Sequence, residues 1–291
     1  MTISINKLLG IAPHAIENNT YSPSSLALKL TTSSTTDYTP ENYEPLAENV
    51  PSKILVLCTE QANVPMTNGT YFSSGNHPVE TFVPMLHLDN AGFECEIFTP
   101  TGKPVELEMW AMPDKDEQMQ KIYQKYKSDL ENPQSLAELV KRNFEDTQEY
   151  CAIFIPGGHG ALLGLPEDKN VGKLINWVYQ EDLFLLSICH GPAALLAAAS
   201  DNESFAYTGY KIAAFPDSFD RLTPLIGYMP GQLTWFFGEK LKKQGMTITN
   251  KFADNSCYAD RKLITGASPK AAQDFAKLAA TTLVSSLNSR S

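Results

Sequence analysis

The chain has 291 residues, of which 43% are hydrophobic and 19% charged, a balance typical of a soluble globular protein. Its formal net charge of -10 and the lack of any basic run argue against a nucleic-acid-binding surface. The 5 cysteines are widely spaced and include no Cys-x-x-Cys pair, so we expect neither a disulfide framework nor a structural zinc site. Because no apolar stretch approaches the length of a membrane span, we predict a cytoplasmic protein that does not enter a membrane.

Residues 1–52 differ in composition from the rest of the chain. Ser22–Pro40 is rich in Ser, Thr and Pro, and Glu41–Pro51 adds acidic residues and further prolines. Such a composition is typical of segments with little regular structure of their own. We therefore predict an irregular N-terminal extension over residues 1–52, which lies over the core or reaches a partner, and a core domain over residues 53–291.

From Lys53 onwards, short apolar runs alternate with segments in which apolar residues recur at helical spacing. This alternation predicts a three-layer α/β sandwich around a mainly parallel, flavodoxin-like sheet. The predicted strands cover Lys53–Cys58, Phe93–Phe98, Tyr150–Ile155, Leu183–Cys189, Lys211–Phe215, Met246–Asn250 and Lys262–Thr265. The predicted helices begin near Pro78, Asp116, Pro133, Val171, Pro192, Gln232 and Ser268.

Residues 103–147 interrupt the alternation of strands and helices. Asp116–Leu130 is amphipathic at helical spacing, and a second helix is expected after Pro133. Two helices inserted between strands predict a small helical cap over a site.

Cys189 is the strongest candidate for chemistry. A buried strand is predicted to end there, followed by a tight turn through His190 and Gly191 and a helix with Pro192 in its first turn. Unpaired N–H groups and the positive helix end at such a junction favour a thiolate. The adjacent histidine completes a pairing of nucleophile and base. We predict a nucleophilic cysteine, the alternative being a small buried apolar residue.

Glycines and acids follow other predicted strands at the same edge of the sheet, where ligands bind in open α/β folds. The N–H group of Gly158 and that of His190 are a candidate oxyanion hole, although paired glycines also form ordinary tight turns. Glu80 either stabilises the N-terminus of its helix or points at Cys189 and holds its proton.

Two aspartates follow the predicted strand that ends at Phe215. Either Asp217 or Asp220 is placed to orient His190 and complete a Cys-His-Asp arrangement. Loop aspartates also form turns, so the residues alone leave both readings open.

Four short motifs lie at this predicted edge: Ser74-Gly-Asn-His-Pro-Val-Glu80, Ile155-Pro-Gly-Gly-His-Gly-Ala161, Ser187-Ile-Cys-His-Gly-Pro-Ala193 and Ala214-Phe-Pro-Asp217. With these motifs the chain resembles the PfpI superfamily, and within it the HchA branch of heat-inducible chaperones and glyoxalase III enzymes. Further matching stretches extend the resemblance over about residues 50–280: Glu108-Met-Trp-Ala-Met-Pro113, Ile226-Gly-Tyr-Met-Pro-Gly231 and Asp260-Arg-Lys-Leu-Ile-Thr-Gly266.

The resemblance implies a role for each candidate residue. Cys189 becomes the nucleophile, His190 and Asp220 its triad partners, Glu80 the acid beside the thiol, and Gly158 with the His190 amide the oxyanion hole. Relatives in this branch bind zinc through a His, Glu, His set. The matching positions here are Asp89, Glu94 and Tyr126, which retain only the glutamate, so we expect no metal and no other cofactor.

The resemblance also implies an activity. The expected reaction is the cofactor-independent conversion of a small 2-oxoaldehyde such as methylglyoxal to a 2-hydroxy acid, or the deglycation of protein and nucleotide amines by the same thiol. A holdase chaperone that binds unfolded proteins and a small-peptide amidase or peptidase are the alternatives. The branch further implies a homodimer.

Overall fold

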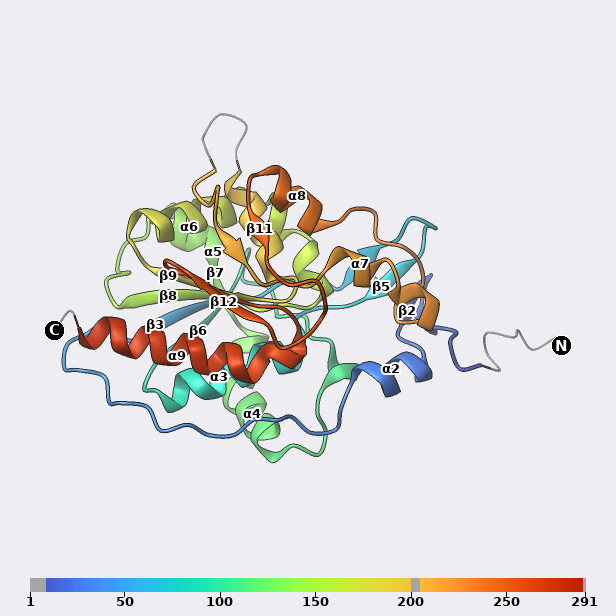
Figure 1. The fold of residues 1–291 in the computed structure, drawn as a ribbon, viewed down its shortest axis with the longest axis horizontal. Coiled ribbons are helices and arrows are strands. Elements are labelled where there is room, and N and C mark those ends of the chain that lie inside the picture. Colours follow the sequence, from blue (N-terminus) through green and yellow to red (C-terminus); the bar gives the residue numbers. More distant parts are fainter. Residues whose placement is uncertain (1–8, 200–204, 290–291) are drawn as a thin grey trace.

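A seven-stranded sheet runs through the centre of the computed structural model, which describes residues 9–199 and 205–289 (Figure 1). The strand order is β12-β13-β9-β8-β3-β6-β7, and neighbours are parallel except for β12 and β13. The mainly parallel, flavodoxin-like α/β fold predicted from the sequence is therefore confirmed. The strands are β3 (Lys53–Leu57), β6 (Glu94–Thr99), β7 (Gln134–Ser135), β8 (Tyr150–Ile155), β9 (Phe184–Ile188), β12 (Cys257–Asp260) and β13 (Leu263–Gly266).

The central strands β8 and β9 are buried at every residue. Because helices cover both faces of the sheet, no side chain of these strands alternates toward solvent, which explains their uninterrupted apolar runs. The two strands are parallel, so their carboxyl ends meet at one edge. There Ile155 leads into the glycine-rich turn and Ile188 leads into Cys189.

Helices form a layer on each side of the sheet (Figure 1). One face carries α3 (Pro78–Asn90), α4 (Glu117–Glu131) and α9 (Ala272–Asn288), and their buried side chains form one core cluster. The other face carries α5 (Leu136–Lys141), α6 (Lys169–Gln180) and α8 (Phe237–Lys243). Among the described residues, no helix is long and apolar enough to cross a membrane.

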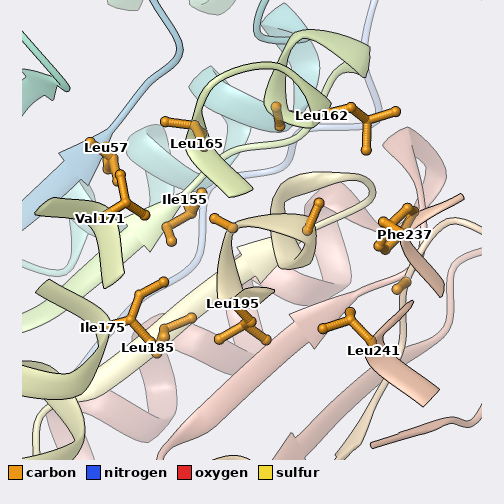
Figure 2. Close-up of a cluster of buried hydrophobic side chains, with 14 of the residues drawn as sticks. Leu57, Ile155, Leu162, Leu165, Val171, Ile175, Leu185, Leu195, Phe237 and Leu241 are labelled. Atoms are coloured by element: carbon orange, nitrogen blue, oxygen red, sulfur yellow. The ribbon is translucent and has the colours of Figure 1, made fainter. Parts of the chain in front are cut away.

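The face of the sheet that carries α5, α6 and α8 is closely packed with apolar side chains (Figure 2). Ile155 of β8 and Leu185 of β9 lie in one cluster with Val171 and Ile175 of α6 and with Leu195, each at most 1% exposed. Close packing of this kind resists displacement of either strand. The ends of β8 and β9, which carry the candidate residues, are therefore held in fixed positions by the core.

Shorter elements complete the fold. The short strands are β1 (His14–Glu17), β2 (Thr20–Ser22), β4 (Asn63–Pro65), β5 (Tyr71–Ser73), β10 (Lys211–Ile212) and β11 (Thr247–Ile248). The short helices are α2 (Ser25–Thr31) and α7 (Asp217–Asp220). Single turns of 3-10 helix cover Met109–Ala111, His159–Leu162, Leu165–Glu167, Thr223–Ile226 and Pro269–Ala271, and a longer one covers Gly191–Ala198.

The N-terminal extension has more regular structure than its composition predicts. β1 and β2 join β5 and β4 in a four-stranded sheet, and Ser24 caps α2 by accepting a hydrogen bond from the Ala27 N–H at 3.1 Å. The expectation of little regular structure is thus wrong for residues 14–31, because pairing with neighbouring strands stabilises β1 and β2 and the Ser24 cap stabilises α2. It holds for residues 32–52, which contain no helix or strand, whereas residues 1–8 lie outside the described part.

The two helices of the inserted region do not form a cap. α4 packs beside α3 on one face of the sheet, and α5 packs beside α6 on the other. Between them the chain adds β7 to the edge of the sheet, parallel to β6. The prediction of a cap over the site at residues 103–147 is wrong, because each amphipathic helix buries its apolar face on a different side of the sheet.

Two predicted strands and one predicted helix are shorter than expected. Only β10 and β11 form within Lys211–Phe215 and Met246–Asn250, and they pair with each other outside the main sheet. Beyond β10, the N–H of Ala213 and that of Ala214 donate to side chains instead of to a strand. The helix expected from Gln232 begins only at Phe237, at the start of α8.

Candidate active site

Cys189 lies at the turn between β9 and the 3-10 helix Gly191–Ala198, in a backbone conformation that few non-glycine residues adopt. Its φ is 59°, in the left-handed region that costs an ordinary residue about 1–2 kcal/mol. The Cys189 N–H donates to the Gly266 carbonyl at 2.8 Å, and the Phe215 N–H donates to the Cys189 carbonyl at 3.0 Å. These two bonds hold the strained turn, and the thiol faces a cavity.

A chain of contacts leads from the thiol to a buried carboxylate. Cys189 Sγ lies 3.3 Å from His190 Nδ1, and His190 Nε2 lies 2.9 Å from Asp220 Oδ2. The Phe215 ring stacks on the His190 imidazole, with centroids 4.7 Å apart and planes at 27°. The imidazole therefore has one nitrogen directed to the thiol and the other to the carboxylate.

Asp220 contacts two histidines. Its Oδ1 lies 2.9 Å from His159 Nε2, and the rings of His159 and His190 have centroids 4.1 Å apart. Burial alone would raise the pKa of Asp220, but the charges and hydrogen bonds of the two histidines hold it well below its usual range. Asp217, the alternative from the sequence, instead accepts hydrogen bonds from two backbone N–H groups at the start of α8.

Glu80, in the first turn of α3, is fully buried and faces the Cys189 thiol. Neither of its carboxyl oxygens has a hydrogen bond of ordinary geometry to the described residues. Gly157 allows the close approach, because a Cβ there would overlap Glu80 Oε2 and lie 2.7 Å from Cys189 Cβ. Burial raises the pKa of Glu80 to about 8, so the carboxyl is mostly protonated at neutral pH.

The thiol and this carboxyl influence each other's ionisation. Burial raises the pKa of Cys189 well above its usual range, and a charged Glu80 raises it further. The thiolate predicted for the strand–helix junction stays a prediction, and burial of the sulfur works against it. A protonated Glu80 removes the second effect and offers an O–H donor to sulfur, so a thiolate is accessible only while Glu80 keeps its proton.

Two backbone N–H groups beside the thiol, those of Gly158 and His190, donate to no backbone carbonyl of the described residues. Gly158 has a φ of 104°, and a Cβ there would lie 2.6 Å from the His77 nitrogen. The Gly158 N–H faces the Glu80 carboxyl, and the oxyanion pair of Gly158 and His190 stays a prediction.

These groups border a cavity of about 390 Å³. Much of the lining comes from Leu30 and Thr31 of α2 and from apolar side chains within residues 215–228, not from the inserted helices. The polar floor also includes His77 and Glu108. Burial lowers the pKa of His77 to about 3, so its imidazole is neutral.

Comparison with known proteins places the chain in a family. The DJ-1/PfpI family matches residues 71–218. The protein/nucleic acid deglycase HchA of Pseudomonas aeruginosa (strain UCBPP-PA14) is 45% identical over 275 residues, which cover 94% of this chain and 94% of that protein. The chain belongs to the DJ-1/PfpI family. The protein of the same name from Escherichia coli O7:K1 is 48% identical over 265 residues, covering 91% of this chain and 92% of that one.

A solved structure shares the DJ-1/PfpI fold. Glyoxalase III from Candida albicans superposes with a TM-score of 0.62 at 23% identity, covering 78% of this chain and 96% of that one. The resemblance of the motifs to the PfpI superfamily and its HchA branch is confirmed.

The positions that match the zinc ligands of the HchA branch do not suit a metal in this DJ-1/PfpI protein. Tyr126 Oη donates to Asp89 Oδ1 at 2.7 Å, and Lys125 forms an ion pair with the same carboxylate. Burial raises the pKa of the Tyr126 phenol, which keeps it a donor. Asp89 is already bound to Lys125 and Tyr126, and none of the three positions holds a histidine. Asp89, Glu94 and Tyr126 therefore do not form a set of ligands that suits zinc.

A second set of potential metal ligands lies in the site itself. His159, His190 and Asp220 present ligand atoms within 4.8 Å of one another. Both histidine Nε2 atoms are already hydrogen-bonded to the carboxylate oxygens. This geometry is that of a hydrogen-bonded relay.

Three residues of the DJ-1/PfpI site received no role from the sequence. His77 and His159 lie inside motifs that were noted for Glu80 and for the glycines, and Glu108 begins a matching stretch. The sequence marks these three residues only as polar side chains within motifs that line the cavity. The contact of His159 with Asp220 and that of Glu108 with Ser74 are tertiary contacts that no spacing rule predicts.

Proposed function

We propose that this protein is a glutathione-independent glyoxalase and deglycase that acts on small 2-oxoaldehydes such as methylglyoxal and on the early adducts they form with amines. The observation that carries the proposal is the chain of contacts Cys189–His190–Asp220, whose thiol and imidazole line one cavity with a buried, neutral Glu80. That set supplies a nucleophile, a base for its proton, and a second acid–base group on the opposite side of sulfur.

In the first step, the Cys189 thiol adds to the aldehyde carbon. A carbon–sulfur bond forms, His190 Nδ1 takes the thiol proton, and the neutral Glu80 gives its proton to the aldehyde oxygen. The products are a hemithioacetal, a Glu80 carboxylate and a His190 imidazolium. Asp220 stabilises the transient imidazolium, and the N–H groups of Gly158 and His190 stabilise the developing oxyanion.

In the second step, the Glu80 carboxylate takes the proton from the carbon bonded to sulfur, the neighbouring carbonyl oxygen gains a proton from an acid of the site, and an enediol forms. Glu80 then returns its proton to the neighbouring carbon, the other enediol hydroxyl gives its proton back to that acid, and an acyl thioester forms. One carbon is oxidised and the other reduced, so the step needs no external redox partner. Water then cleaves the thioester and releases a 2-hydroxy acid: the water proton goes to Glu80, and the His190 imidazolium returns its proton to the Cys189 sulfur.

Deglycation uses the same thiol. In an aldehyde–amine adduct, sulfur displaces the amine: the carbon–sulfur bond forms, the carbon–nitrogen bond breaks, and the amine leaves with the thiol proton. The relatives from Pseudomonas aeruginosa and Escherichia coli are named protein/nucleic acid deglycases, and their high coverage of the chain supports this substrate class.

The test is conversion of methylglyoxal without glutathione, followed by product analysis. We expect wild-type protein to form lactate and Cys189→Ala to fall to the rate of the protein-free control. A Cys189→Ala variant that is as active as wild type contradicts the proposal. Glycated N-acetyl-lysine in place of methylglyoxal tests the deglycase step with the same pair.

A second candidate function is the binding of unfolded chains. Large apolar side chains are exposed beside the cavity, with Leu30 at 62%, Leu222 at 55% and Leu225 at 69%. An exposed apolar rim of this kind suits a holdase. We expect Cys189→Ala to suppress aggregation of a heated client as well as wild type does, because the thiol is not part of the rim.

Location and assembly belong to the same proposal. All of Cys58, Cys95, Cys151, Cys189 and Cys257 are free thiols, which suits the reducing cytoplasm. We propose a cytoplasmic homodimer. Size-exclusion chromatography with light scattering tests the assembly, and a monomer at micromolar concentration contradicts it.

A further inference from the structure

Glu108 is a buried carboxyl that the proposed steps leave without a role. It is 1% exposed. Its Oε1 accepts hydrogen bonds from Ser74 Oγ at 2.6 Å and from the His159 N–H at 3.4 Å. Its Oε2 is buried without a partner among the described residues. A buried polar atom without a partner is costly, so a ligand that reaches Oε2 gains a favourable contact.

The backbone is built to hold this carboxyl at the cavity. The Asn76 N–H donates to the Glu106 carbonyl at 2.7 Å, and the Glu108 N–H donates to the Asn76 carbonyl at 3.0 Å. Gly75 permits the approach of these segments, because a Cβ there would lie 2.5 Å from the Glu106 carbonyl oxygen. Glu108 is thereby fixed beside α3, the helix that carries Glu80.

Glu108 shares the cavity with the reacting groups. It lines the same 390 Å³ space as Cys189 and Glu80. A charge on Glu108 would raise the pKa of both neighbours. Burial raises the pKa of Glu108 itself, which favours a protonated carboxyl able to donate.

We propose that Glu108 is a catalytic acid–base residue, which exchanges protons with the substrate oxygens through Oε2 while Glu80 moves the proton between the carbons. This inference rests on the proposed function. As Glu80 takes the proton from the sulfur-bound carbon, Glu108 gives its own proton to the neighbouring carbonyl oxygen, and the enediol forms. As Glu80 returns its proton to carbon, the Glu108 carboxylate takes the proton of the other enediol hydroxyl, and the thioester carbonyl forms. Both residues end in their starting states.

The test is Glu108→Gln in the full-length protein, with methylglyoxal as substrate and without glutathione. Glutamine keeps the contacts to Ser74 and His159 and a donor toward the cavity, but it cannot transfer a proton. We expect kcat to fall about 100-fold or more with KM within about threefold of wild type. Alkylation of Cys189 by iodoacetamide should continue, because the thiol and His190 are untouched.

The matched control is Glu106→Gln, two residues away, whose side chain does not line the cavity and whose backbone makes the contacts described above. It should keep wild-type kcat. If Glu108→Gln is poorly folded by circular dichroism, Ser74→Ala keeps the carboxyl but frees it to rotate. That variant should lower kcat by about tenfold without changing KM.

The outcomes separate the two proposals. Active wild type, inactive Cys189→Ala and Glu108→Gln within about threefold of wild-type kcat would overturn the role of Glu108 and leave the function intact. Wild-type protein that does not convert methylglyoxal would overturn both. A Ser74→Ala variant with unchanged kcat also contradicts the role of Glu108.

Discussion

Replacing Glu80 with glutamine is expected to remove a large pH dependence from the stability of this protein. The carboxyl is fully buried and has no hydrogen-bond partner of ordinary geometry, and its pKa is raised from 4.5 to about 8 by burial. Between these two values the native state binds a proton that the unfolded chain has released. The contribution of Glu80 to stability is therefore fully present below pH 4.5 and is lost as pH rises through about 8.

The magnitude follows from linkage. A carboxyl that titrates about 3.5 pH units higher in the native state, at about 1.4 kcal/mol per unit, lowers the free energy of unfolding by about 5 kcal/mol across the range. Because Glu80 is fully buried, solvent screening does not reduce this figure. Glutamine of similar shape does not ionise, so Glu80→Gln gains on wild type as pH rises.

Urea denaturation from pH 5 to pH 9 measures the effect. The difference in the free energy of unfolding between Glu80→Gln and wild type should grow by several kcal/mol, most steeply between the two pKa values, and should level off above about pH 8. Repeating the pair in a Cys189→Ala background removes the titration of the thiol. Glu117→Gln, at a side chain that is 87% exposed, controls for loss of a carboxyl as such. Parallel curves, with a difference that is constant across this range, would refute the assignment of a displaced ionisation to Glu80.

Three further predictions follow from the same contacts. Glu80→Gln should be alkylated by iodoacetamide at pH 9 about tenfold faster than wild type, because no charge opposes the Cys189 thiolate; equal rates contradict the coupling. Asp220→Asn should lower kcat by about 10²- to 10⁴-fold, since an amide cannot stabilise the His190 imidazolium; near-normal steady-state kinetics contradict the relay. Gly157→Ala should destabilise the protein by about 1–3 kcal/mol in urea, because the added Cβ meets Glu80 and Cys189; unchanged stability means that the site has room to relax.

The sequence predicts the elements that follow simple local rules. β8 and β9 are recognisable because their burial on both faces requires uninterrupted apolar runs. α3 is recognisable from Pro78 in its first turn. The rules fail where side chains replace backbone partners: Asn250 and Thr265 accept the N–H groups that a longer β10 would direct to a strand. The local rules also fail for the inserted helices α4 and α5. These helices pack on opposite faces of the sheet because β7 joins the sheet between them, and their own amphipathic patterns do not indicate this placement.

In the candidate site, too, local features can be predicted from the sequence and contacts between distant residues cannot. Cys189 and His190 are neighbours in sequence, so their pairing is visible at once, and Glu80 is marked by its place in the first turn of a helix. The contacts of His159 with Asp220 and of Ser74 with Glu108 span 61 and 34 residues. They exist only because strand ends converge at one edge of a parallel sheet. Sequence motifs thus point to the right segments without indicating which side chains meet.

Three buried carboxyls at or next to one cavity differ in their surroundings. Asp220 is held ionised by two histidines, and burial holds Glu80 neutral without a hydrogen bond of ordinary geometry to the described residues. Glu108 has one oxygen hydrogen-bonded and the other without a partner in the described part of the chain. The same functional group is thereby suited to three tasks: a fixed negative charge for an imidazolium, a base for a carbon-bound proton, and a donor for a substrate oxygen. Since the reaction proposed here moves protons between two carbons and two oxygens without a cofactor, it requires more than the one acid–base pair of a simple triad. Glu80 and Glu108 are suited to supply the additional pair, and glycines allow the approach of both: a Cβ at Gly157 would overlap Glu80 Oε2, and a Cβ at Gly75 would overlap the Glu106 carbonyl.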